Sequence, residues 1–268
     1  MRSTISICYI VSNKGKLVKR YTIAMHIFNE ILQILSKSND QSEICKLYSQ
    51  FIDTEDLCFD VGANIGSITR ILLELDAKVV SIEPQKSCFK VLKRLYGNKV
   101  LNRLKGYNER IFLINKGLGE EEGYLQLHIS ETSVISTMSD KWMKEGRFSK
   151  YNYPEIQLVP ITTLDKLILQ YGLPRFCKID VEGFEYHVLK GLTKPIPFMS
   201  FEFTREFFDD SKKCIEYLLS IGNAEFNFSI AESYKLYYSK WVTKEELYEG
   251  INSLEDDHLW GDIYVKFV

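Results

Sequence analysis

Five carboxylates end or follow apolar runs that read as buried strands, and these are the residues whose types and spacing could do chemistry. They are Asp60, Glu83, Asp180, Glu182 and Glu202. The carboxyl ends of parallel strands meet at one edge of a sheet, which is where open α/β sheets bind ligands. Carboxylates gathered there could hold a cation, accept hydrogen bonds from ribose hydroxyls, or remove a proton from a substrate.

The segment 59–66, FDVGANIG, predicts a strand that enters a glycine turn and then a helix. After the turn, apolar residues recur at helical spacing from Ile68 to Leu75. Gly62 and Gly66 would let the backbone turn tightly and let a ligand lie against it. Glu83 closes the next apolar run, about 20 residues on, where nucleotide sites place an acid for the ribose hydroxyls. We therefore expect an adenosine-containing ligand.

The ligand is further defined by what the turn lacks. A pyrophosphate-binding turn needs G-x-G-x-x-G, but Asn64 stands at the middle glycine and the third glycine is absent. The carboxylate of Asp60 would oppose a pyrophosphate and would suit a cation. S-adenosylmethionine carries an ammonium and a sulfonium and no phosphate, so it fits better than a nicotinamide dinucleotide. The alternative is a strand-to-helix turn that binds nothing, with Asn64 or Ser67 as the helix N-cap.

Asp180, Glu182 and Glu202 come from two neighbouring strand ends and are the predicted catalytic residues. Crowded acids raise one another's pKa, so one of them could act as a general base near neutral pH. Asp180 is the first choice, with Glu182 as its partner. Two alternatives remain: Glu182 could instead cap the following helix, where an acid is stabilised by the helix dipole, or the acids could hold a divalent cation. The sequence has no dedicated metal-ligand spacing, and we expect no metal.

Strands and helices alternate along the chain, which predicts a parallel sheet with helices on both faces. The expected strands lie at about 57–61, 78–83, 111–115, 124–129, 156–160, 176–179, 198–203, 224–230 and 262–267. The expected helices lie at about 65–75, 87–96, 163–171, 185–191 and 210–221. Residues 1–50 are predicted to form a helical extension with an apolar stripe from Ile23 to Leu35, followed by a polar break at 36–42. This helix would pack on the domain or on a second subunit, and the alternative is a substrate lid.

Residues 130–155 are polar, aromatic and poorly periodic, and they are predicted to form a mobile substrate loop within a domain spanning 51–268. Its aromatic residues could stack on a sugar or anchor the loop; they are Trp142, Phe148, Tyr151 and Tyr153.

The net charge of −2 disfavours nucleic acid as a partner. The six cysteines show no C-x-x-C pair, and no apolar stretch is long enough to span a membrane. We expect a cytoplasmic protein.

Several blocks together resemble the FkbM family of S-adenosylmethionine-dependent methyltransferases. They are FDVGANIG at 59–66, SIEP at 81–84, NKGLGEEEG at 115–123, TLDKLI at 163–168 and KIDVEGFEYHVLKG at 178–191. The resemblance covers about residues 55–205. It implies an α/β, Rossmann-like class I methyltransferase fold, with a mostly parallel seven-stranded sheet and an antiparallel last strand.

The resemblance also implies roles for single residues and an acceptor class. The donor's methionine end would contact Asp60, Gly62, Asn64 and Gly66, its ribose Glu83, and its adenine the stretch from Asn115 to Gly117. The acceptor would be a hydroxyl on a small natural product, a sugar or a glycan. A catalytically inactive nucleotide-binding module and an RNA methyltransferase are the competing functions.

Overall fold

The computed structural model describes residues 40–98, 102, 106–107 and 109–268. The apolar stripe predicted between Ile23 and Leu35 lies outside the described residues, so its role as a lid or an oligomer contact stays a prediction. Helix α2 (Asp40–Tyr48) begins inside the predicted polar break. Ile44, Leu47 and Tyr48 of this helix are buried. Their i, i+3, i+4 spacing follows a polar first turn, so the polar residues 40–42 begin a helix.

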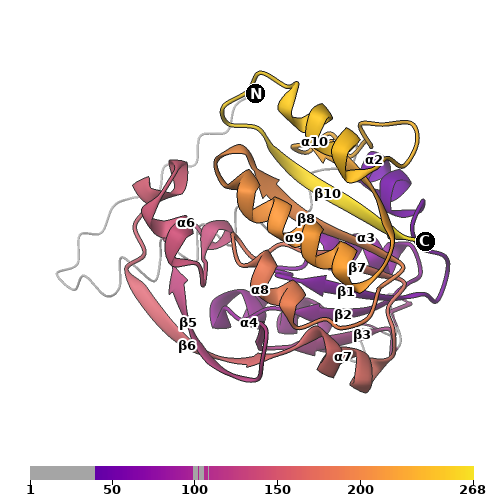
Figure 1. Ribbon diagram of the computed structural model, residues 1–268. Helices are drawn as coiled ribbons and strands as arrows, with labels where there is room; N and C mark the ends of the chain where they lie inside the picture. The colour runs from indigo at the N-terminus through magenta and orange to yellow at the C-terminus, as the bar shows by residue number, and fades with distance from the viewer. Residues whose placement is uncertain (1–39, 99–101, 103–105, 108) are drawn as a thin grey trace, which may run out of the picture.

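The described chain forms a seven-stranded sheet in the order β3-β2-β1-β7-β8-β10-β9 (Figure 1). Its strands are β1 (Leu57–Val61), β2 (Lys78–Ile82), β3 (Ile111–Ile114), β7 (Phe176–Ile179), β8 (Phe198–Thr204), β9 (Ala224–Ile230) and β10 (Trp260–Phe267). The pairs among β3, β2, β1, β7 and β8 are parallel, whereas β10 runs antiparallel to both β8 and β9. The predicted sheet, including its antiparallel last strand, is confirmed.

Helices cover both faces of this sheet (Figure 1). They are α3 (Ser67–Glu74), α4 (Lys86–Tyr96), α7 (Leu164–Tyr171), α8 (Glu185–Lys190), α9 (Phe208–Ile221) and α10 (Lys244–Asn252). Side chains alternate across the strands, so Phe59 packs in the core shared with α7 to α10, while Cys58 packs in the core shared with α2 to α4. None of the described helices is long and apolar enough to cross a bilayer.

A second, three-stranded sheet in the order β4-β6-β5 was not predicted as a separate unit. It consists of β4 (Gly117–Leu118), β5 (Gly123–Ile129) and β6 (Glu155–Thr162). The connection from β5 to β6 is the predicted substrate loop, and it carries η1 (Ser133–Ile135), α6 (Asp140–Lys144) and η2 (Arg147–Lys150). A further short helix, η3 (Arg205–Phe207), leads into α9.

The β5–β6 connection is anchored by aromatic stacking. Trp142 is 3% exposed, and its ring centroid lies 3.9 Å from that of Phe148 and 5.2 Å from that of Phe207. Of the two roles left open for these aromatic residues, Trp142 and Phe148 therefore take the anchoring one. The part of the connection before α6, including Ser133 and Met138, instead lines the central cavity.

Candidate active site

A cavity of about 420 Å³ opens at the carboxyl ends of the parallel strands. It is lined by seven of the predicted site residues: Asp60, Gly62, Asn64, Glu83, Gly117, Asp180 and Glu182. The opposite wall comes from the start of β10, with Trp260, Asp262 and Tyr264, which share one face of that strand. The structure thus brings five of the seven predicted donor residues and two of the three predicted catalytic acids to one cavity, while Gly66, Asn115 and Glu202 do not line it.

The glycine turn follows β1 and is fixed by close backbone approaches. Gly62 has φ +81°, and a Cβ on it would lie 1.7 Å from the backbone oxygen of Asp180, at the end of the neighbouring strand. Only glycine fits such a position. Gly66 has φ +93° and is the N-cap of α3, a place that the no-ligand alternative gave to Asn64 or Ser67. A Cβ on Gly66 would meet Leu92 of α4, so this glycine serves helix packing.

Glu83 holds the glycine turn in place. Its carboxylate accepts hydrogen bonds from the backbone N–H of Asn64 at 2.8 Å and of Gln85 at 2.6 Å. The side chain is 5% exposed, and this burial raises the pKa of Glu83 to about 7 although both hydrogen bonds act against the rise. A carboxylate has about four lone-pair sites, so two bonds leave acceptor capacity for ribose hydroxyls.

Asp60 lies at the base of the cavity. Its carboxylate accepts a hydrogen bond from the hydroxyl of Thr69, which also lies 2.6 Å from the hydroxyl of Ser81. Burial raises the pKa of Asp60 to about 6; Thr69 and the nearby Lys178 oppose the rise. A cationic ligand would favour the ionised carboxylate further, which suits an ammonium or sulfonium and not a phosphate.

Asn115 and Gly117 follow β3 and shape the cavity wall differently. The Asn115 amide donates to the backbone oxygens of Glu83 at 2.8 Å and of Pro84 at 3.1 Å, which ties the ends of β2 and β3 together. Gly117 lines the cavity, and a Cβ on it would lie 2.5 Å from the Met138 side chain. Gly117 therefore borders the expected adenine position directly, whereas Asn115 acts through the backbone.

Asp180, Glu182 and Glu202 form one cluster, with carboxylate oxygens that all lie within 4.8 Å of one another. Burial raises the pKa of Glu182 well above its ordinary value, and the charges of Glu202 and Asp180 raise it further. The pKa of Glu202 is also raised well above its ordinary value, by burial first and then by Asp180. These shifts favour the protonated forms of Glu182 and Glu202, so the cluster can exchange protons with a bound substrate.

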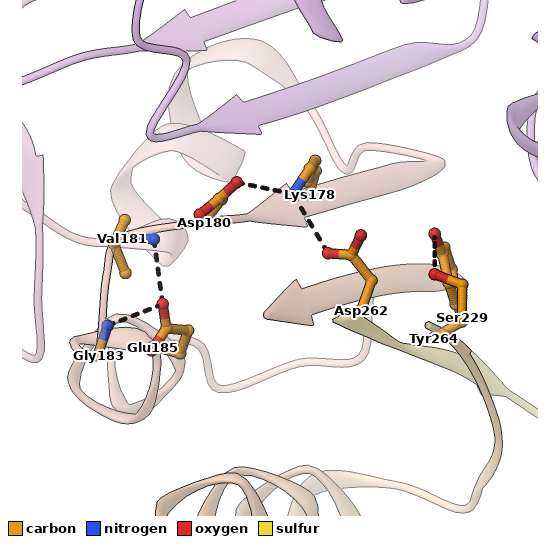
Figure 2. Close-up of polar contacts among 8 residues, drawn as sticks. All are labelled: Lys178, Asp180, Val181, Gly183, Glu185, Ser229, Asp262 and Tyr264. Carbon is orange, nitrogen blue, oxygen red and sulfur yellow. Dashed lines mark hydrogen bonds and ion pairs between the residues drawn. The ribbon is translucent and has the colours of Figure 1, made fainter. Parts of the chain in front are cut away.

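Lys178 and Asp262 belong to the same cluster and were missed by the sequence reasoning. The Lys178 ammonium forms ion pairs with Asp180 and Asp262 (Figure 2), 3.1 Å from Asp180 Oδ2 and 3.3 Å from Asp262 Oδ1. Burial disfavours this charge, but the two carboxylates outweigh the penalty and hold the pKa of Lys178 well above its ordinary value. The available signal was a lysine inside the apolar strand Phe176–Ile179.

Glu185 takes the helix-terminus role that was weighed for Glu182. Its Oε1 accepts hydrogen bonds from the backbone N–H of Val181 at 3.1 Å and of Gly183 at 3.3 Å (Figure 2). These bonds hold the turn between β7 and α8, and burial raises the pKa of Glu185 to about 7. The carboxyl of Glu182 is thereby left to face the cavity, with a backbone φ of +55°.

The three clustered acids are spaced closely enough to surround a divalent cation. Such a cation would have to compete with the protons that Glu182 and Glu202 retain and with the ammonium of Lys178 beside Asp180. It would also lie next to the sulfonium of the expected donor, which repels it. The absence of a metal from the chemistry stays a prediction.

Comparisons with known proteins identify the family of this chain. The family model described as the methyltransferase FkbM domain matches residues 60–229. The chain is 27% identical over 172 residues to the hexuronic acid methyltransferase AglP of Haloferax volcanii, and the match covers 64% of each chain. A solved FkbM methyltransferase from Methylobacillus flagellatus KT is similar at 17% identity and a TM-score of 0.49, over 80% of this chain and 44% of that one.

A methyltransferase-like structure from Streptococcus mutans, in complex with S-adenosylhomocysteine, is similar at 11% identity and a TM-score of 0.41, over 84% of this chain and 95% of that one. The family model covers more than half of the chain, from the end of β1 through most of β9. The chain belongs to the FkbM family of S-adenosylmethionine-dependent methyltransferases.

Proposed function

We propose that this protein transfers the methyl group of S-adenosylmethionine to a hydroxyl oxygen of a sugar, a glycan or a related natural product. The observation that carries the proposal is the carboxylate cluster of Asp180, Glu182 and Glu202, two of which line the same cavity as Asp60 and Glu83. Methyl transfer to oxygen needs a group that aligns the acceptor hydroxyl and a group that accepts its proton. The carboxylate cluster would supply both groups.

The donor would lie along the cavity from β2 to β7. Glu83 would accept hydrogen bonds from its ribose, Gly62 and Asn64 would contact its methionine part, and Asp60 would face its positive charge. Because β1 lies between β2 and β7 in the sheet, this orientation carries the sulfonium toward Asp180. The acceptor hydroxyl would then approach from the side of β8 and β10.

In the transfer step, the acceptor oxygen forms a bond to the methyl carbon as the carbon–sulfur bond breaks, and the sulfonium becomes a neutral thioether. The hydroxyl proton passes to Asp180, which is 39% exposed and is one of the two acids that Lys178 contacts. Glu182, which lines the cavity and whose raised pKa favours its protonated form, would hydrogen-bond the acceptor and fix its oxygen in line. Alignment of this kind supplies several kcal/mol of the barrier.

The proposed acceptor class is supported by the charge of the carboxylate cluster and by the name of a related protein. The cluster is acidic, which disfavours an RNA backbone beside the transferred methyl. The Haloferax relative acts, by its name, on a hexuronic acid, which is a sugar derivative. The described cysteines form no disulfide, which fits the proposed cytoplasmic location.

Asp180→Asn tests the proposal because asparagine keeps the shape of the side chain and cannot take the proton. We expect binding of S-adenosylhomocysteine within about twofold of wild type and turnover lowered by about 100-fold or more, the usual range for loss of a general base. Lys212→Met, which alters an exposed ion pair on α9, is the control. If Asp180→Asn turned over normally an acceptor that the wild-type enzyme methylates, another group would have to take the proton.

A further inference from the structure

Trp260 differs from the other two tryptophans in what its ring contacts. Trp142 stacks on Phe148, and Trp241 packs against Phe51 and Phe198. The ring of Trp260 makes no contact with another aromatic ring among the described residues, and its side chain is 38% exposed at the wall of the cavity. A large aromatic surface left open in a ligand cavity indicates a binding surface.

The register of β10 places this ring relative to the reacting groups. Asp262 pairs with Glu202 across the β8–β10 ladder, and Trp260 pairs with Thr204, two residues further toward the mouth. Two residues of a strand span about 7 Å, and residues two apart share a face. The indole therefore stands next to the carboxylate cluster, on the same side of the sheet.

The donor cannot occupy this surface if it lies as proposed. Glu83, the expected ribose ligand, follows β2, and the sheet order β2-β1-β7-β8-β10 separates it from Trp260 by four strand spacings. Strands lie about 4.8 Å apart, so the adenosine end would be roughly 19 Å from β10. Trp260 is left for the acceptor.

We infer that Trp260 is the platform on which the pyranose ring of the acceptor stacks, a conclusion that rests on the proposed function. A pyranose presents an apolar face of C–H groups to an aromatic ring and hydroxyls around its edge. With its face on Trp260, its edge meets Asp262, and one hydroxyl reaches the cluster at Asp180. Trp260 is then a specificity-determining residue that selects a ring with a flat apolar face and a hydroxylated edge.

The test measures binding of methyl glucopyranosides, mannopyranosides, galactopyranosides and glucuronopyranosides to the full chain saturated with S-adenosylhomocysteine. Intrinsic fluorescence and calorimetry are recorded for wild type, Trp260→Phe and Trp260→Leu. We expect Kd for the bound pyranoside to rise about tenfold in Trp260→Leu, and less in Trp260→Phe, which keeps an aromatic face. Tyr124→Leu, which alters a 70% exposed aromatic on β5 away from the cavity, should leave Kd unchanged.

Comparison of the neutral and acidic glycosides shows whether the site accepts a pyranose that carries a carboxylate. Trp260-dependent binding of either kind of glycoside supports the inference. Equal pyranoside affinity in wild type and Trp260→Leu, or no pyranoside binding by protein that binds S-adenosylhomocysteine, would overturn the inference alone. A wild-type protein that binds no S-adenosylhomocysteine would overturn the proposed function as well.

Discussion

Lys178→Met removes the cation that Asp180 and Asp262 share, and the structure sets the size of the expected effect. Loss of one partner from a fully buried ion pair costs about 3–5 kcal/mol, because the remaining charge stays in a medium of low polarity. Lys178 is buried, with 7% of its side chain exposed, but Asp180 and Asp262 are 39% and 23% exposed. Water reaches both carboxylates, so we expect a loss of about 2 kcal/mol in the free energy of unfolding.

For a chain of this length, that loss corresponds to a fall in Tm of about 4–8 °C. The matched control is Lys266→Met on β10, the strand that carries Asp262; the ion pair of Lys266 with Glu225 spans 3.2 Å with exposures of 34% and 43%. An exposed pair of this kind contributes about 0–1 kcal/mol. Thermal and urea unfolding of wild type and both variants give the comparison.

The effect of Lys178→Met should also depend on pH. When the ammonium is gone, the crowded carboxylates can relieve their repulsion only by taking up protons. The difference in Tm from wild type should therefore be smaller at about pH 5 than at about pH 8. An equal loss in both variants, or a loss that does not change with pH, would refute the view that Lys178 balances the charge of this cluster.

Three further predictions concern protons and metal. The folded-state pKa of Glu185 is about 7 against an ordinary 4.5, so its stabilising contribution is complete below about pH 4.5 and is lost as pH rises through 7. Glu185→Gln keeps the accepting oxygen and should remove about 2.5 kcal/mol of that decline between about pH 5 and pH 8, as measured by urea unfolding. If the decline were unchanged, a group other than Glu185 would cause it. Asp60 has a pKa of about 6, so binding of cationic S-adenosylmethionine at that pH should release protons from this carboxyl. Calorimetry in two buffers should show less proton release for Asp60→Asn than for wild type. Equal proton release by both proteins would exclude this ionisation. A chelator such as EDTA should leave turnover unchanged, and a loss restored by Mg²⁺ would instead assign a metal to Asp180, Glu182 and Glu202.

The sheet could be predicted because each strand carries its own signal. The run 176–179 is mostly apolar and lies between Arg175 and Asp180, and 224–230 alternates apolar and polar residues; the structure forms strands with the same bounds. Helix α10 was missed although Thr243 and Glu246 form a capping box at its start. The second sheet was missed because β4 is only two residues long, and its pairing with β6 is decided by tertiary contacts.

The composition of the site could be predicted only in part, for a physical reason. Acids at strand ends are visible in the sequence because parallel strands end at a common edge, and this principle gathered Asp60, Glu83 and Asp180. Asp262 comes from the strand that runs the opposite way, so it reaches the cluster from the start of β10, not its end. That contribution depends on register, which the sequence does not reveal.

Calorimetric titration with S-adenosylmethionine, S-adenosylhomocysteine and NAD, on wild type and Glu83→Ala, tests the central claim most directly. Glu83 accepts two backbone hydrogen bonds of the glycine turn, so a melting curve must first show that the variant is folded. The account predicts that wild type binds both adenosyl ligands and not NAD, and that the folded variant binds them at least about tenfold more weakly. Binding of NAD in preference to S-adenosylmethionine, or no binding of either adenosyl ligand, would contradict it.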